Sequence, residues 1–226
     1  MSKPQFSLYG HPSGWAPNPP KIALFLEWLG LSYELVPLTF DDGESGVKGP
    51  KFLAINPNGR MPALVDHGNN DYTVWESGAI LLYLADKYDP SGSFYGKTPE
   101  ERGITAQWLA FQISGVGPMQ GQVNWFLHHH EKRTGVAPQP EVLKRYQDET
   151  DRVYKVLDGQ LARQAEAGSD YIALDRVTIA DFAFAGWVYI CSTAKIEIAK
   201  YSNVQRWYEK LSSDERFKKA YAKLGS

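Results

Sequence analysis

A strand, a helix and a second strand follow one another within the first 38 residues, and this order constrains the fold more than any other feature. Residues 6–9 form a short apolar run that ends at a loop with two glycines and a proline. Residues 18–30 begin with Asn18 and two prolines, continue with mostly apolar residues and end in glycine, which predicts a helix of about three turns capped by Asn18. Residues 33–38 alternate like a strand, so we expect a βαβ unit with a parallel strand pair.

The following segment completes an α/β domain by about residue 88. Residues 39–50 are typical of a loop, and residues 51–55 of a short helical turn. A turn with two prolines and an Asn-Gly pair, residues 56–62, enters a predicted strand at 63–66. Asn69 and Asn70 separate that strand from another at 72–75, which predicts a hairpin, and a helix follows from Glu76-Ser77 to about Tyr88.

The rest of the chain has the periodicity of helices. Residues 89–98 combine turn residues with no apolar period and are the best candidate for a linker. We expect helices over 99–130, bent by two glycines and Pro118, and over 140–167, 201–211 and 214–223. Thr178 and Asp181 predict a capping box at another helix start. The predicted fold is α/β plus all-α, with a first domain at 1–88, a linker at 89–98 and an all-helical domain at 99–226.

Composition excludes several classes of partner. The 226 residues carry a net charge of −2 with both signs interspersed, so we expect neither nucleic acid nor a membrane surface as a partner. No run approaches the roughly 20 apolar residues that span a bilayer, and the N-terminus has no apolar leader, so we expect a cytoplasmic protein. The single cysteine, Cys191, excludes internal disulfides and fits a reducing compartment, and we expect it in the core.

Three stretches carry a resemblance to a known family. They are the turn and strand at 56–64, the segment 75–84 that begins Trp75-Glu76-Ser77, and the capping segment 178–183. Together, in this order and spacing, they resemble the soluble glutathione transferases, which have a thioredoxin-like N-terminal domain and a helical C-terminal domain. Residues 16–18 (Ala-Pro-Asn) and 114–122 are similar to a narrower branch, the bacterial nu class and the fungal transferases related to the yeast nitrogen-catabolite regulator.

The resemblance implies a site for glutathione in the first domain. Ser77 and the helix start would bind the γ-glutamyl carboxylate and Glu76 its ammonium, although the pattern alone also fits a plain helix cap. Met61-Pro62 is similar to the cis-proline step whose backbone faces the cysteinyl residue, although trans is the commoner form of such a bond. Lys48 is the closest match to the cation that binds the glycine carboxylate, and it also fits a solvated loop lysine.

A free thiol is mostly protonated at neutral pH, so glutathione needs a group that stabilises its thiolate. In nu-class-like enzymes an asparagine donates its amide to the sulfur, and Asn18 is the matching residue. Capping its own helix is the alternative role for Asn18. Ser13 is the second candidate and Tyr9 the third, because other classes use a hydroxyl near this point, and residues 13–15 enlarge the loop here.

The second substrate is expected in an apolar pocket lined by Trp15, Met119 and Trp125, although core packing is an equal alternative for Trp125. Residues 128–130 are three consecutive histidines, which lack the i, i+4 spacing of metal ligands, so we expect no metal site. The Lys218-Lys219 pair fits an ordinary surface feature.

These observations predict a glutathione transferase that activates the glutathione thiol for attack on hydrophobic electrophiles, a detoxification chemistry. Reduction of disulfides or peroxides with glutathione is a second activity that the branch suggests. The alternative is a ligandin, a carrier that binds glutathione conjugates or aromatic metabolites without turnover. The family is usually dimeric, so we expect a homodimer.

Overall fold

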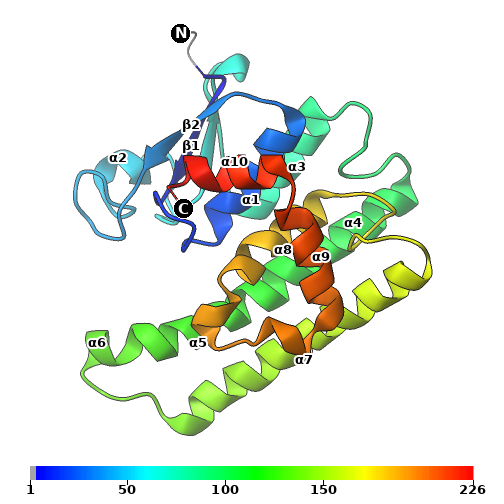
Figure 1. Ribbon diagram of the computed structural model, residues 1–226. Coiled ribbons are helices and arrows are strands. Elements are labelled where there is room, and N and C mark those ends of the chain that lie inside the picture. Colours follow the sequence, from blue (N-terminus) through cyan, green and yellow to red (C-terminus); the bar gives the residue numbers. More distant parts are fainter. Residues whose placement is uncertain (1–3, 226) are drawn as a thin grey trace. The chain divides into compact units, whose positions relative to one another are not determined.

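Four strands near the N-terminus of the chain form one mixed sheet in the computed structural model, which describes residues 4–225 (Figure 1). The strands are β1 (Phe6–Gly10), β2 (Tyr33–Pro37), β3 (Ala63–Asp66) and β4 (Tyr72–Trp75), in the order β2-β1-β3-β4. β1 and β2 are parallel, as the strand, helix, strand pattern predicts. β3 runs antiparallel to both β1 and β4, and the predicted hairpin closes through η1 (His67–Asn69).

Helices α1 (Asn18–Leu29), α2 (Pro50–Leu53), α3 (Ser77–Tyr88) and α10 (Glu215–Lys223) accompany the sheet. α1 packs against β1, α3 and α10. Gly10 allows the start of α1 to approach the end of β1, because a Cβ there would lie 2.8 Å from the Cβ of Pro19. On the other face of the sheet, Tyr9 and Ala63 pack with Phe52 of α2.

The chain divides by its contacts into two units. The first holds the residues up to Tyr95 and those from Leu211 onward, and the second runs from Gly96 to Lys210. The C-terminal residues therefore group with the α/β unit. The predicted boundary at 89–98 assigned them to the helical domain, because a single boundary cannot describe a chain that returns to its first unit. Residues 1–3 and 226, which fall within the predicted domains 1–88 and 99–226, lie outside the described residues.

Helix α10 is held to α1 by a buried carboxylate. The Glu27 side chain is only 4% exposed and forms ion pairs of 2.7 Å with both Lys219 and Lys223. Burial alone would raise the pKa of Glu27, but the two lysines outweigh it and the pKa lies below its ordinary value. Lys218 and Lys219 lie at the surface as expected, and Lys219 in addition pairs with a buried carboxylate, which the sequence did not predict.

The second unit is helical, as predicted. Its elements are α4 (Pro99–Phe111), the π-helical turn η2 (Gln112–Val116), α5 (Gly117–His128), α6 (His130–Thr134), α7 (Pro140–Glu166), α8 (Ile179–Tyr189), the 3-10 turns η3 (Cys191–Ala194) and η4 (Ile198–Lys200), and α9 (Ser202–Ser212), which belongs to this unit up to Lys210. The predicted interruption of the segment 99–130 takes the form of the π-helical turn before Gly117-Pro118. Within residues 4–225, no helix is both long and apolar enough to cross a bilayer.

A buried aspartate organises this unit. Thr178 and Asp181 form the predicted capping box at the start of α8. The Asp181 carboxylate also accepts hydrogen bonds from the Ile172 N–H at 3.0 Å and the Trp207 Nε1–H at 2.8 Å. Burial raises the pKa of Asp181, and these donors act against that rise by stabilising the carboxylate.

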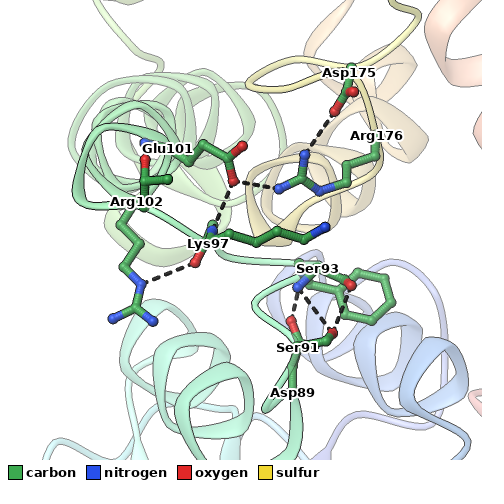
Figure 2. A network of polar contacts seen from close by, with 11 residues as sticks. Asp89, Ser91, Ser93, Lys97, Glu101, Arg102, Asp175 and Arg176 are labelled. Carbon is green, nitrogen blue, oxygen red and sulfur yellow. Dashed lines mark hydrogen bonds and ion pairs between the residues drawn. The ribbon is translucent and has the colours of Figure 1, made fainter.

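Hydrogen bonds order both halves of the predicted linker, each within its own unit (Figure 2). In the first unit, the Asp89 carboxylate accepts from the Phe94 N–H at 2.7 Å and from the Ser91 hydroxyl at 2.5 Å. In the second unit, Glu101 accepts from the Lys97 N–H at 2.8 Å and pairs with Arg176 at 2.5 Å. The segment 89–98 is thus a structured connection.

Candidate functional site

Strand register brings three separate loops to one end of the sheet. Tyr9 pairs with Ala63, and Ala63 pairs with Trp75, so these residues form one row across β1, β3 and β4. The next residue of each chain segment beyond this row is Gly10, Pro62 and Glu76. The loop after β1, the turn before β3 and the start of α3 therefore meet at this sheet end, where the sequence places most of its candidate residues.

The start of α3 has an unusual backbone. Glu76 precedes the helix with φ +71° and ψ +118°, a region that residues other than glycine rarely adopt. Ser77 is the first helical residue and is only 8% exposed, whereas the Glu76 side chain lies at the surface. The first N–H groups of a helix carry partial positive charge, so this position favours a carboxylate ligand.

A buried lysine that sequence reasoning missed lies beneath this helix start. Lys21 of α1 is 2% exposed, and its ammonium donates a hydrogen bond of 3.2 Å to the Ser77 hydroxyl oxygen. Burial lowers the pKa of Lys21 to about 7, and the Glu76 carboxylate acts against that fall. The signal in the sequence is a charged residue within the apolar run 19–26.

The same contact shows that α1 and α3 converge at their N-terminal ends, since Lys21 lies one turn into α1 and Ser77 begins α3. Asn18 precedes Lys21 by three residues, so the two share one face of the helix. Asn18 is half-buried and is the first residue of α1, while Pro17 is the cap residue and makes no side-chain cap hydrogen bond. The prediction that Asn18 is the N-cap is therefore wrong by one position, because Pro17 already has helical angles.

The two hydroxyl candidates have other partners. The Ser13 hydroxyl lies 2.8 Å from Nδ1 of His11, whose ring stacks on Phe40 with 5.0 Å between ring centroids. Tyr9 packs with Phe52 at 5.8 Å between ring centroids. Burial, together with the negative charge of Glu34, raises the pKa of Tyr9. These contacts engage Ser13 in its own loop and Tyr9 in the core under α2.

Asn58 links two candidate residues of opposite charge. Lys48 lies at the surface and donates to the Asn58 carbonyl at 3.0 Å, while the Asn58 amide donates to Oε1 of Glu76 at 3.3 Å. Buried Asn56 shapes this turn by donating to the Arg60 carbonyl at 2.6 Å. Sequence reasoning missed both asparagines as contacts, although the Asn-rich turn before β3 was the available signal.

The Met61-Pro62 peptide bond is cis, as the resemblance implies. Met61 is half-buried, and its sulfur lies 3.2 Å from the His11 backbone N–H. The turn before β3 thus contacts the loop after β1 directly, which brings Met61 to the same sheet end as His11 and Gly10.

The residues expected around the second substrate belong to different units. Trp15 in the first unit is 65% exposed. In the second unit, Met119 lines an open groove of about 370 Å³ with Glu141, Val142, Arg145 and Tyr146. Trp125 is half-buried and stacks on His129 at 5.9 Å between ring centroids. That Trp15, Met119 and Trp125 line one pocket stays a prediction.

Two of the three consecutive histidines contact backbone carbonyls. His128 Nε2 lies 2.7 Å from the Thr193 carbonyl and His130 Nδ1 lies 2.9 Å from the Val136 carbonyl. Across residues 4–225 there is no group of three or more His, Cys, Asp or Glu side chains placed to hold a metal ion. The single cysteine, Cys191, is buried in η3, and burial raises the pKa of its thiol.

Comparison with known proteins identifies the family of the chain. The family model of the glutathione S-transferase N-terminal domain matches residues 4–86, and that of the C-terminal domain matches residues 118–215. Glutathione S-transferase 2 of Schizosaccharomyces pombe is 43% identical over 220 residues, which cover 96% of this chain and 88% of that protein. The disulfide-bond oxidoreductase YfcG of Escherichia coli is 40% identical over 203 residues, covering 87% and 86% of the two chains.

Among solved structures, Ure2p in complex with glutathione superposes with a TM-score of 0.88 and 32% sequence identity, covering 98% of this chain and 95% of that one. The thioredoxin-like and helical architecture expected from the sequence is thereby confirmed. With two family models that together match most of its length, the chain belongs to the glutathione S-transferase family.

Proposed function

We propose that this protein binds glutathione at the sheet end formed by β1, β3 and β4 and holds its thiol as a thiolate for attack on a second substrate. The observation that carries the proposal is the convergence of the N-terminal ends of α1 and α3, marked by the buried contact between Lys21 and Ser77. Two helix starts at one place offer backbone N–H groups and positive dipole ends to a ligand with several negative charges.

The charges of the site match those of glutathione. Ser77 and the first N–H groups of α3 suit the γ-glutamyl carboxylate, and Glu76 suits the neighbouring ammonium. Lys48 supplies a cation for the glycine carboxylate. Asn58 joins Lys48 and Glu76 by hydrogen bonds, so the cation and the carboxylate of the proposed site are held near each other. The backbone of Met61 would bind the cysteinyl residue as a neighbouring strand does.

Asn18 is the proposed partner of the sulfur. A thiol with a pKa near 8.5 is only a few per cent ionised at neutral pH, so a donor aimed at the sulfur increases the reactive fraction. The side-chain amide of Asn18 is such a donor, and its place at the start of α1 adds the helix dipole. The thiolate would then form a bond to an electrophilic carbon as the leaving group departs with its electron pair.

Disulfide reduction is the second reaction of the same thiolate, and the relative from Escherichia coli named for that activity favours it. The glutathione thiolate would attack one sulfur of the disulfide, form a mixed disulfide and release the other sulfur as a thiolate. The only cysteine of the chain is buried Cys191, so a second glutathione has to resolve the mixed disulfide and leave as glutathione disulfide.

The test compares thiol transfer to a chloronitrobenzene with glutathione-dependent reduction of a small disulfide, in wild type and in Asn18→Ala. We expect both rates to fall at least about tenfold in the variant, and the faster wild-type reaction identifies the dominant chemistry. Ser13→Ala tests the second candidate, and because the Ser13 hydroxyl is engaged by His11 we expect the rates to change less than threefold. If glutathione binds and both wild-type rates stay at background, the protein is a ligand carrier and the catalytic proposal fails.

A homodimer in the cytoplasm stays a prediction. Sedimentation equilibrium of the full chain would give about twice the 25.4 kDa chain mass if it is correct.

A further inference from the structure

Lys21 is a buried charge in the part of the first unit that supports the proposed glutathione site. Its side chain is 2% exposed, and an ammonium removed from water to this degree is costly unless its surroundings stabilise it. The ammonium contacts the hydroxyl of Ser77 at 3.2 Å, at the first residue of α3. An apolar side chain would fill the same space under α3 without the free-energy cost of removing a charge from water. The charge is therefore more consistent with a functional role than with packing alone.

The direction of this hydrogen bond determines how Ser77 can act. A lysine ammonium has three donors and no acceptor, so the Ser77 oxygen must accept. The Ser77 hydroxyl hydrogen is then directed away from Lys21 and can be donated to a ligand. Lys21 therefore orients Ser77 as a hydrogen-bond donor and increases its acidity, at a helix start that already favours a carboxylate.

Glu76 is an ionisable group whose charge acts on Lys21. The elements packed against α1 present other ionisable side chains, which are Tyr9 on β1, Tyr83, Asp86, Lys87 and Tyr88 on α3, and Glu215, Arg216, Lys218, Lys219, Tyr221 and Lys223 on α10. Lys219 and Lys223 are paired with Glu27, nearly two turns further along α1. The exposed Glu76 carboxylate thus provides the balancing charge near the buried ammonium.

We propose that Lys21 is a positioning residue for the γ-glutamyl carboxylate of glutathione: its buried ammonium orients Ser77 as the donor to that carboxylate and supplies the opposing charge, so glutathione affinity depends on the protonation of Lys21. This inference rests on the proposed function, because it assigns the glutamyl end of glutathione to the start of α3. It adds a residue that acts through Ser77 and a coupling between glutathione binding and proton binding.

The coupling has a definite sign. A carboxylate placed over Ser77 favours the charged form of Lys21 and raises its pKa from about 7, so the complex takes up protons at and above this pH. By linkage, affinity falls as the pH rises through that range, because the free protein then holds a neutral lysine. Ionisation of the glutathione thiol changes affinity in the opposite direction, so the test needs a ligand without a thiol.

The experiment is titration calorimetry of the full chain with S-methylglutathione at about pH 6, 7 and 8, in buffers of different ionisation enthalpy, which measures protons taken up per ligand bound. In wild type we expect proton uptake above about pH 7 and a Kd that rises about three- to tenfold from pH 6 to pH 8. In Lys21→Met, uptake should vanish, the Kd should stay constant with pH, and binding at pH 6 should be about tenfold weaker. Lys87→Met, at the exposed end of α3, is the matched control and should behave as wild type.

Binding without proton uptake in wild type would overturn the inference, and so would equal uptake in wild type and Lys21→Met. If Lys21→Met does not fold, the wild-type protein alone tests the inference, through the number of protons taken up on binding and the midpoint of that uptake near pH 7. A purely structural role of Lys21 would change stability and leave the pH dependence of Kd unaltered, which also overturns the inference. Failure of wild type to bind S-methylglutathione or glutathione at any of these pH values would instead overturn the proposed function.

Kinetics give an independent readout. Because Lys21 acts on the glutamyl end and Asn18 on the thiol, Lys21→Met should raise the KM for glutathione about tenfold with kcat changed less than threefold. A fall in kcat at constant KM would assign Lys21 to thiol activation and contradict the proposal.

Discussion

Two residues near the start of α3, Lys21 beneath it and Glu76 just before it, have features that stability alone would not favour. Lys21 is a charge in the core beneath this helix, and Glu76 has a backbone conformation that suits glycine. Unfavourable features of this kind collect at functional sites, where the surrounding structure maintains them. Both residues lie at the same sheet end, so we expect substitutions there to separate stability from glutathione binding.

The cost of burying Lys21 depends on pH. The pKa is lowered in the folded state, so the unfolded chain binds more protons between about pH 7 and pH 10.5, and stability rises with pH across this window. Lys21→Met removes this dependence. We expect its stability advantage over wild type to shrink by about 2–4 kcal/mol between about pH 6 and pH 9.5, measured by urea unfolding. A constant difference across that range would show that folding does not lower the pKa of Lys21 and that it stays charged in the folded protein throughout.

Glu76 offers a matched pair of substitutions. Glu76→Gly and Glu76→Ala both remove the carboxylate, but only glycine adopts φ +71° without strain. We expect Glu76→Gly to be more stable to urea than Glu76→Ala by about 1–2 kcal/mol, with the same loss of glutathione affinity in both. Equal stabilities would mean that the loop relaxes to another conformation when the side chain changes.

At the scale of elements, ion pairs and caps fix helices whose partners are distant in sequence. α10 follows α1 by nearly 200 residues, yet Lys219 and Lys223 of α10 neutralise Glu27 of α1. In the second unit, Asp181 at the start of α8 accepts from Trp207 of α9. Each carboxylate joins two helices through its side-chain contacts, so its neutral isostere tests the contribution of those contacts.

Glu27→Gln should loosen the contact between α10 and α1. The amide loses the charge that balances two lysines, so we expect the free energy of unfolding at neutral pH to fall by about 1–3 kcal/mol in urea titrations. The Glu27 pKa is lowered by folding, so this contribution is present above the unfolded pKa and is lost as the pH falls through the folded one. Glu44→Gln, which removes an exposed and solvent-screened pair with Lys51, is the control and should change the free energy of unfolding much less than Glu27→Gln. An equal effect of the two substitutions would contradict the role given to Glu27.

Asp181→Asn should be more damaging. The asparagine amide cannot accept all the hydrogen bonds that the carboxylate receives from Ile172, Thr178 and Trp207, so buried donors lose partners. We expect a loss of about 2–4 kcal/mol in thermal or urea unfolding, with increased exposure of the Trp207 ring in fluorescence. A loss below about 1 kcal/mol would show that the donors find other partners.

At the scale of the whole molecule, the sequence predicted those helices and strands that local patterns determine. The alternation of residues 33–38, the apolar run in α1 and the Thr178–Asp181 spacing each identify an element because period and capping are local properties. The family resemblance added the cis form of the Met61-Pro62 bond, which the structure has, and the binding roles expected at the start of α3. The assignment of Asn18, Ser13, Lys48 and the other site residues to glutathione stays a prediction.

What the sequence did not reveal depends on contacts between distant segments. Lys21 has no acidic residue at i−4, i−3, i+3 or i+4, and its partner Ser77 is 56 residues away, so spacing within the helix cannot explain its burial. The return of α10 to the first unit likewise includes the ion pairs of Glu27 with Lys219 and Lys223, which no local pattern predicts. Such pairs exist only once tertiary packing brings them together.

The central claim is that this site ionises the thiol of bound glutathione, and the most direct test is the ultraviolet absorbance of the thiolate, titrated against pH in the complex. We predict that the pKa of the bound thiol lies at least about one unit below the value near 8.5 of a free thiol, and that Asn18→Ala returns most of that shift. A bound thiol that titrates like free glutathione in wild type would contradict the account.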